Sequence, residues 1–172
     1  MGLHIVLIEQ PVLVKTESEY RALTDAERDV VADSSTAATT EERFAARCDG
    51  RPPGYYRGLR RSVAEFSYSG YGAFRELLAE AVFGMPAAEV WADPDTVART
   101  HPTPENALVN LIDFGDSDGF FGPTTSGQIA AGMKAAEAAF AEVANEWDLR
   151  AFTAMQEAFQ DAADNNGLVV WR

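Results

Sequence analysis

The clearest pattern of apolar and polar positions lies in the last third of the chain. Apolar residues recur every three or four positions in two stripes, Ile129, Met133, Ala136, Phe140, Val143 and then Leu149, Phe152, Met155, Phe159, Ala163. This period predicts two amphipathic helices. The first opens at the capping box Thr125-Ser126-Gly127-Gln128, and the second ends at Asn165-Asn166-Gly167. Residues 168–171 have the composition of a closing strand.

The first half of the chain contains shorter apolar segments. Residues 3–8 and 11–15 are rich in Val, Ile and Leu and predict a pair of N-terminal strands. Thr24-Asp25-Ala26-Glu27 fits a capping box that opens a short helix. Residues 62–68 alternate between apolar and polar and predict a strand, and residues 74–82 have the helical period.

Three segments between these elements lack a clear period. Residues 33–40 and 87–105 are predicted to be loops, because they are polar or interrupted by proline. Residues 108–114 are apolar enough for a central strand, with a short buried helix as the alternative. We therefore expect a single α/β or α+β domain over residues 1–172, with about four or five strands and helices packed on the sheet.

The composition is consistent with a single domain. A chain of 172 residues with 47% hydrophobic content supports one core rather than two. No apolar run approaches the roughly 18 residues that a membrane span needs, and the N-terminus lacks a basic leader, so we expect a cytoplasmic protein that does not bind membranes. Cys48 is the single cysteine, which excludes an internal disulfide and a cysteine-built zinc site.

The net charge of −13 is unevenly distributed. Residues 1–50 contribute −5, residues 51–75 contribute +4, and residues 76–172 contribute −12. Such an acidic surface repels nucleic acid phosphates and attracts basic partners. Direct nucleic acid binding is therefore disfavoured, although acidity that serves only solubility is the alternative explanation.

The most informative segment is the acidic, glycine-rich run 113–123, which precedes the first of the two long helices. Asp113, Asp116, Ser117 and Asp118 are its candidate ligand-binding residues. Hard carboxylate oxygens suit Mg²⁺ or Ca²⁺, so Asp116 and Asp118 are candidate metal ligands, although the first and last positions of a calcium loop do not match. Alternatively, these carboxylates accept hydrogen bonds in the turn and lie near the positive end of the next helix.

A basic and aromatic segment, residues 55–75, offers complementary chemistry. Guanidinium groups and rings suit a planar or phosphorylated ligand, and the candidates are Arg57, Arg60, Tyr68, Tyr71 and Arg75. In the alternative, these arginines pair with the protein's own carboxylates. Ser117, His101 and Asp113 are the residue types of a nucleophilic triad, but spacing in the sequence does not show that they form one, and we predict no catalytic residues.

Three motifs resemble a scattered group of uncharacterised bacterial and phage proteins: Tyr68-Ser69-Gly70-Tyr71, Asp116-Ser117-Asp118-Gly119 with Gly122-Pro123, and Ala162-Ala163-Asp164-Asn165. Members of that group read Ser-Asp-Cys-Asp/Glu-Gly before the helix start. The resemblance spans residues 62–172 and implies a common architecture and a shared site, but no reaction. Ser117 stands where the group has cysteine, and Gly115 where it has a small polar residue, so a thiol-based role is absent from this site.

Two functions follow from the sequence. The first is an acidic interaction protein that binds or neutralises a basic protein partner, as immunity proteins do with toxins. The alternative is a small-molecule or divalent-metal-binding module, in which the acidic loop 113–119 faces the Arg/Tyr segment 55–75. We expect no cofactor, with a divalent cation as the alternative, and we expect a binding protein rather than an enzyme.

Overall fold

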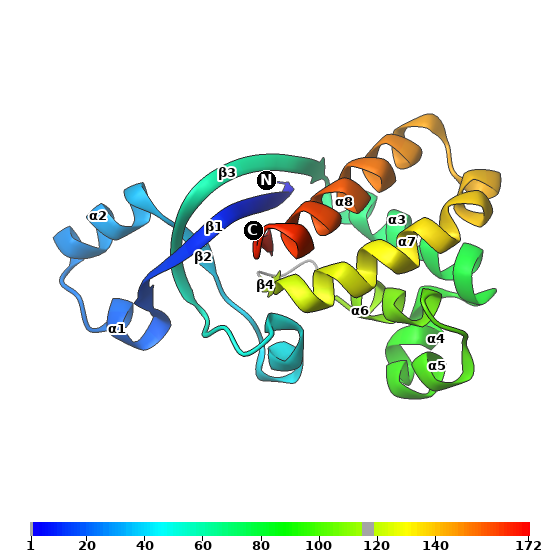
Figure 1. The fold of residues 1–172 in the computed structure, drawn as a ribbon, viewed down its shortest axis with the longest axis horizontal. Helices are drawn as coiled ribbons and strands as arrows, with labels where there is room; N and C mark the ends of the chain where they lie inside the picture. The colour runs from blue at the N-terminus through cyan, green and yellow to red at the C-terminus, as the bar shows by residue number, and fades with distance from the viewer. Residues whose placement is uncertain (1, 115–118) are drawn as a thin grey trace.

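A five-stranded antiparallel sheet organises the computed structural model, which describes residues 2–114 and 119–172. The strand order is β2-β3-β1-β5-β4 (Figure 1). The strands are β1 (Leu3–Thr16), β2 (Thr36–Ala38), β3 (Gly54–Phe66), β4 (Gly119–Phe121) and β5 (Leu168–Trp171). With helices packed on this sheet, the chain forms a single α+β domain, as the sequence predicts.

The N-terminal strand pair expected from the sequence is instead one strand of 14 residues, β1. Its pairing with β3 shifts register between Glu9 and Val12, where Gln10 has a φ of 50° and Pro11 cannot donate a backbone hydrogen bond. The irregularity is therefore absorbed as a bulge within a continuous strand. β1 and β3 together form a long curved antiparallel pair that extends beyond the rest of the sheet (Figure 1).

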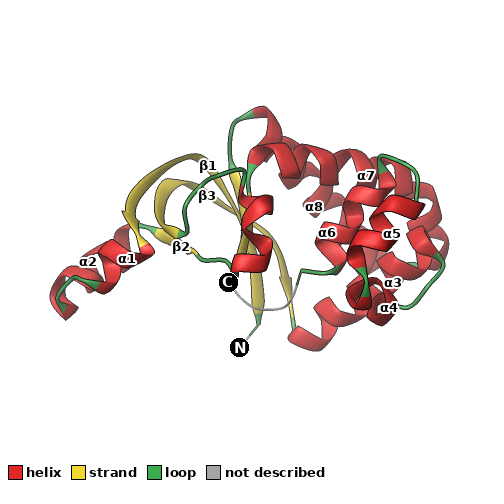
Figure 2. Cartoon of the chain, turned by 90° about the horizontal axis from the view of Figure 1, so that it is seen from below, coloured by secondary structure: helices red, strands yellow, loops and turns green. Residues whose placement is uncertain are grey.

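The helices lie in two groups (Figure 2). α1 and α2 lie at the far end of the β1–β3 pair, whereas α3 to α8 are gathered beside the other part of the sheet. The α-helices are α1 (Glu17–Arg21), α2 (Asp25–Ser34), α3 (Tyr68–Phe83), α4 (Ala87–Ala92), α5 (Pro94–Thr100), α6 (Val109–Ile112), α7 (Pro123–Val143) and α8 (Glu146–Asp164), and the 3-10 helices are η1 (Glu42–Cys48) and η2 (Glu105–Leu108).

The two long C-terminal helices and the closing strand β5 confirm the apolar stripes of the sequence. α7 begins at Pro123, two residues before the predicted capping box, because proline favours the first helical position. The capping box of Thr24 and Glu27 also forms at the start of α2. These signals act among neighbouring residues, which is why the sequence alone indicates them.

Three segments differ from the sequence-based interpretation. Residues 33–40, predicted as a loop, contain the end of α2 and the strand β2, which pairs with β3. Residues 87–105, also predicted as a loop, form α4 and α5, because Pro86 and Pro94 stand at helix starts rather than breaking helices. Residues 108–114 include α6, so the alternative of a short buried helix is the correct one.

Trp171 lies at the centre of the core, fully buried. Its ring contacts Phe114 at 5.2 Å, Phe121 at 5.2 Å and Phe159 at 6.0 Å between ring centroids. β5 is therefore buried between β1 and β4, and α8 crosses the same region. This aromatic cluster fixes Phe114 and Phe121, which flank the acidic loop on both sides.

Candidate functional site

The described residues that lead into the acidic loop are held by an ion pair. The Arg47 guanidinium of η1 donates to Asp113 Oδ2 over 2.6 Å and to the Asn110 carbonyl over 3.0 Å. The two charged side chains are only 12% and 9% exposed. Burial lowers the pKa of Arg47, but the hydrogen bond and charge of Asp113 oppose that shift. Asp113 Oδ2 is thus engaged in an ion pair that joins the end of α6 to η1.

Arg75 and Trp91 hold the same segment from its other side. Arg75 donates to the carbonyls of Ile112 at 3.3 Å and Phe114 at 2.7 Å, and Trp91 Nε1 donates to the Ile112 carbonyl at 2.7 Å. The guanidinium also lies over the Trp91 ring, 4.8 Å from its centroid. Cationic and N–H donors satisfy the carbonyls at the end of α6, where the helix dipole is negative. Arg75 therefore positions the chain rather than facing an open site.

The chain leaving the loop is fixed by η1 as well. Asp49 Oδ2 accepts hydrogen bonds from the backbone of Thr124 at 2.5 Å and Thr125 at 3.2 Å, and Oδ1 accepts from the Thr125 hydroxyl at 3.0 Å. The Gly122 N–H donates to the Arg47 carbonyl at 2.8 Å. Asp49 thus caps α7 from a distant part of the chain, and both ends of the acidic loop are anchored to η1.

The three central residues of the predicted site, Asp116, Ser117 and Asp118, lie outside the described residues. Within residues 2–114 and 119–172, no three His, Cys, Asp or Glu side chains gather closely enough to hold a metal ion. The proposed nucleophilic arrangement gains no support from His101, whose Nδ1 lies 2.8 Å from the Val97 carbonyl. That contact is local, and Asp113 binds Arg47 instead.

The Arg/Tyr segment does not converge on one pocket. Tyr71 is fully buried beside Phe66. Tyr68 is exposed at the start of α3. Arg57 contacts the Ser34 hydroxyl at 3.4 Å and Arg60 the Thr36 hydroxyl at 3.5 Å, so both lie along β3 near α2 and β2. Among the described residues, Arg75 contacts the acidic segment through the Phe114 carbonyl.

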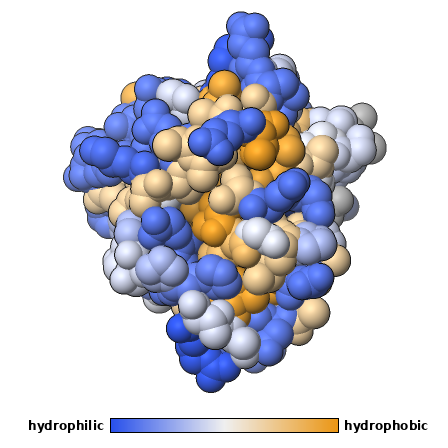
Figure 3. Space-filling view, turned by 90° about the vertical axis from the view of Figure 1, so that its right-hand side faces the viewer, coloured by the Kyte–Doolittle hydropathy of each residue, from blue (hydrophilic) through white to orange (hydrophobic). Residues whose placement is uncertain are grey.

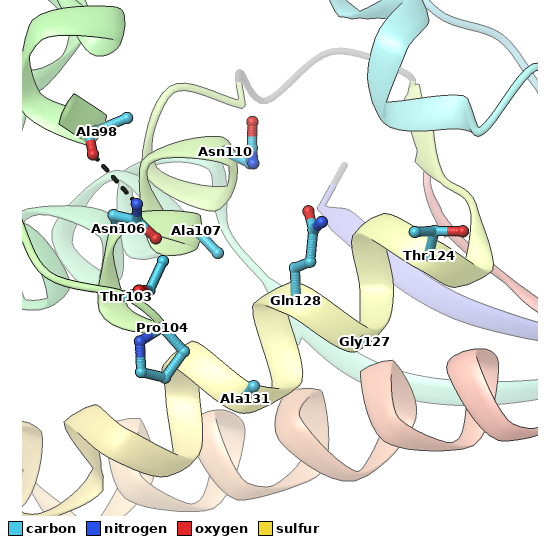
Figure 4. Close-up of a pocket in the computed structure, with 10 residues that line it drawn as sticks. All are labelled: Ala98, Thr103, Pro104, Asn106, Ala107, Asn110, Thr124, Gly127, Gln128 and Ala131. Atoms are coloured by element: carbon cyan, nitrogen blue, oxygen red, sulfur yellow. Dashed lines mark hydrogen bonds between the residues drawn. The ribbon is translucent and has the colours of Figure 1, made fainter.

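A groove of about 630 Å³ runs beside the foot of the loop, between α7 and the segment from α5 to α6. Figure 4 shows the Gln128 amide rising from α7 toward the region where Asn110 of α6 projects. The groove is lined by Ala98, Thr103, Pro104, Asn106, Ala107, Asn110, Thr124, Gly127, Gln128 and Ala131. It therefore combines neutral hydrogen-bonding groups with an apolar floor, and it carries no charge.

A second, more polar hollow of about 300 Å³ adjoins this groove and shares Ala98, Asn106 and Asn110 with it. Arg43, Arg47 and Asp113 are among its lining residues. Arg43 pairs with Glu41 over 2.8 Å, so both arginines have acidic partners. Sequence reasoning missed Arg47, Asp49, Asn110 and Gln128, because no local motif marks side chains that meet only after folding.

The surface also carries a projecting acidic element, which we call the acidic arm and define as α1 and α2, residues 17–34. It contains six acidic and two basic residues, hence a net charge of −4. Hydrogen bonds from Thr24 lower the pKa of the exposed Glu27 carboxyl, and hydrogen bonds from Thr16 do the same for Glu19. The arm therefore stays negatively charged at neutral pH.

The opposite end of the molecule is built from helices and is seen face-on in Figure 3. There, apolar side chains are exposed in patches that hydrophilic side chains interrupt. Val143, near the end of α7, is 43% exposed. Single exposed apolar residues are normal on protein surfaces, so this face does not define a site by itself.

No family model, no curated protein and no solved structure showed significant similarity to this chain. Of the helices in the described part of the chain, none is both long enough and apolar enough to cross a membrane.

Proposed function

We propose that the protein binds a basic protein partner through the acidic arm. The observation that carries this proposal is how few side chains of α2 are buried. This helix of ten residues buries only Val31, while Val30 is 67% exposed and Asp29 and Asp33 extend from the same exposed surface. A helix with so little buried area adds little to the stability of the core, which favours a role at the surface.

The electrostatics of the arm suit a cationic partner. Asp25 lies 3.6 Å from Arg28 and Glu17 pairs with Arg21, whereas Asp29 and Asp33 have no ion pair with any described residue. Unpaired carboxylates on a projecting element attract basic surfaces over distances of about 10 Å at moderate salt. Val30, which is 67% exposed and neighbours Asp29 in α2, supplies an apolar contact beside the charges.

Such a combination resembles the way in which immunity proteins cover basic surfaces of toxins. The charged groups accelerate and orient the encounter, and the apolar side chains are desolvated in the final complex. In this proposal the protein acts by covering the basic surface of its partner, and no chemical reaction is involved.

The test uses an 18-residue helical peptide of lysine and leucine, with leucine at helical spacing, and compares two variants of equal net charge. Asp29→Asn with Asp33→Asn alters the arm, whereas Glu137→Asn with Glu142→Asn alters exposed positions of α7. We expect the arm variant to bind the peptide about tenfold more weakly, and the α7 variant to bind it as the native protein does. Isothermal titration calorimetry at two salt concentrations provides the affinities.

Equal weakening in both variants would show that total charge, rather than the arm, governs binding, and would overturn the proposal. Failure of the native protein to bind the peptide at low salt would do the same. Val30→Ser provides an independent variant, because it preserves every charge and removes only the exposed apolar side chain. We expect it to weaken binding with no change in the salt dependence.

The alternative function, a small-molecule-binding module, is favoured by one observation, the groove with the amides of Asn110 and Gln128. Its size falls within the range of ligand sites, and its uncharged lining suits a neutral polar compound. A thermal-shift screen against nucleosides, nucleotides and divalent ions tests it, because a specific ligand raises the melting temperature by mass action. Loss of that shift in Gln128→Ala would assign the ligand to the groove.

A further inference from the structure

Most of β3 has an unpaired edge. β2 pairs with β3 only from Gly54 to Tyr56, so in the described part of the chain residues 57–66 have a partner, β1, on one side alone. Figure 1 shows β3 as the outer strand of the curved β1–β3 pair along this length. The β3 edge, defined here as the side of residues 57–65 that faces away from β1, therefore presents backbone N–H and C=O groups without a strand partner.

Unpaired edges in folded proteins are usually blocked by charges, bulges or a covering element. β3 has a register shift at Val63, between the pairs of Ser62 and Ala64, and carries three arginines. These features oppose pairing with an identical strand, because Arg57, Arg60 and Arg61 of two copies would repel each other. They do not oppose pairing with an acidic strand.

The charges of the edge remain available for such a partner. Arg61 pairs with Asp161 of α8, but Arg57 and Arg60 contact only hydroxyl groups among the described residues. Residues 57 and 60 lie on opposite faces of the strand, so the two arginines place positive charge on both sides of the exposed edge. This charge is complementary to a negatively charged segment.

A groove follows the end of the same edge. It has a volume of about 490 Å³ and is lined by Val63, Ala64, Glu65, Trp147, Arg150, Ala151 and Ala154. Trp147, at the start of α8, is 45% exposed, and its ring packs edge-on against Phe66 at 5.1 Å between centroids. An exposed strand edge beside a helix, with an apolar groove between them, is the geometry in which extended peptides add to a sheet.

We propose that the β3 edge binds an extended acidic peptide segment of another protein as an additional strand. Backbone hydrogen bonds to β3 supply affinity. Acidic side chains of the peptide that face away from α8 meet Arg60, whereas Arg57 shares the α8 face of the strand with Arg61 and adds to the positive charge at the edge. Every second side chain of an added strand faces the α8 side of the sheet, so an apolar side chain at such a position enters the groove beside Trp147. This edge adjoins the acidic arm where Arg57 contacts Ser34, but the partner proposed for the edge is acidic, whereas the partner proposed for the arm is basic.

The test uses a blocked nine-residue peptide in which glutamate and valine alternate, with two control peptides. One control carries N-methyl groups on alternate residues, which removes the N–H donors of one strand edge, and the other replaces glutamate by lysine. We expect saturable binding of the first peptide with one site per chain, and at least about tenfold weaker binding of both controls. Titration calorimetry with the full-length protein measures all three.

Variants of the protein locate the site. Arg57→Glu with Arg60→Glu reverses the charge of the edge, and Arg21→Glu with Arg99→Glu makes the same change in net charge elsewhere. We expect the edge variant to lose binding of the glutamate peptide by at least about tenfold and to gain binding of the lysine peptide. The control variant should differ from the native protein by less than about threefold, because its exposed arginines lie outside the edge.

A variant of the groove gives a readout that does not depend on charge. Ala154→Phe places a large ring in the groove, and Ala138→Phe adds the same ring to an exposed position of α7. We expect only Ala154→Phe to weaken binding, with circular dichroism and melting temperature unchanged in both. Equal affinity for the native and the N-methylated glutamate peptides would overturn the proposal. So would equal loss of peptide affinity in the two double arginine variants. Self-association that depends on protein concentration and is strengthened by Arg57→Glu with Arg60→Glu would overturn it as well.

Discussion

Arg47 Nη2 lies 2.6 Å from Asp113 Oδ2, which joins two residues that are 66 positions apart in the sequence. Both side chains are almost fully enclosed, and Arg47 also stacks over the Phe44 ring at 4.2 Å from its centroid. This pair connects η1 to the end of α6. It determines how the chain enters the acidic loop, because Asp113 immediately precedes Phe114 of the core.

Removing one partner of this ion pair should destabilise the fold strongly. Asp113→Ala leaves the buried Arg47 guanidinium without its counter-charge, and we expect a loss of about 3–5 kcal/mol in the free energy of unfolding. The double variant Arg47→Met with Asp113→Leu should lose clearly less, because no uncompensated charge remains. Urea unfolding followed by circular dichroism measures both. Similar losses in the two variants would show that the pair acts through packing rather than charge.

The cap that Asp49 provides to α7 leads to a second prediction. Asp49→Ala removes three hydrogen bonds to Thr124 and Thr125, and it places alanine at a φ of 53°, where residues other than glycine, asparagine and aspartate are strained. We expect a loss of about 2 kcal/mol in unfolding free energy. Asp49→Asn tolerates this backbone conformation and keeps one acceptor, so its loss should be smaller. Equal losses would contradict the capping role.

The sequence predicted those parts of the fold that depend on local information. The stripes of α7 and α8, the capping box of Thr24 and the composition of β5 each specify an element within a few neighbouring residues. The pairing partners of β1 and the strand β2 were not accessible in this way. A bulge at Gln10 and a three-residue strand depend on contacts with β3 that sequence periodicity does not encode.

In the candidate site, too, the sequence indicated local features and did not indicate contacts between distant residues. Asp113 and Arg75, two of the candidate residues from the sequence, both contact the end of α6 or the residues that follow it. The sequence indicated neither of their neighbours, because Arg47 and Trp91 come from distant helices without a motif. It grouped Arg57 and Arg60 with Arg75 because they are close in sequence. β3 extends about 3.3 Å per residue, so the strand carries Arg57 and Arg60 away from α3.

The buried thiol of Cys48 predicts a dependence of stability on alkaline pH. Burial raises the pKa of Cys48 to about 11, whereas an unfolded thiol titrates near about 8.5. Above the lower value the unfolded state loses its proton while the folded state keeps it, so the free energy of unfolding falls as pH rises between these two values. The loss from this one group is about 1.4 kcal/mol per pH unit at most.

Urea unfolding between pH 7 and pH 10 measures this dependence, and Cys48→Ala is the matched control because it removes the titrating group. We expect the native protein to lose more stability than Cys48→Ala over this range. A thiol reagent at pH 8 should label Cys48 only when urea unfolds the chain. Rapid labelling of the folded protein, or parallel pH profiles for the two chains, would contradict the burial of a protonated thiol.

The last prediction concerns the close approach of Gly119 to Phe114, two residues of the acidic loop. A Cβ atom built on Gly119 would lie 2.0 Å from Phe114 Cζ. Phe114 cannot move aside, since its ring is enclosed by Phe121 at 4.6 Å and Trp171 at 5.2 Å between centroids. We therefore expect Gly119→Ala to cost about 1–3 kcal/mol of unfolding free energy by overpacking.

A second substitution distinguishes this clash from a simple change in loop conformation. Phe114→Leu removes the ring atoms that the added methyl group would meet, at the cost of a small cavity in the aromatic cluster. If the clash is the cause, the double variant Gly119→Ala with Phe114→Leu should be less destabilised than the sum of the two single variants, with a coupling of about 1 kcal/mol or more. Additive losses would mean that Gly119 is required for its backbone conformation, and that packing against Phe114 does not determine how the loop meets β4.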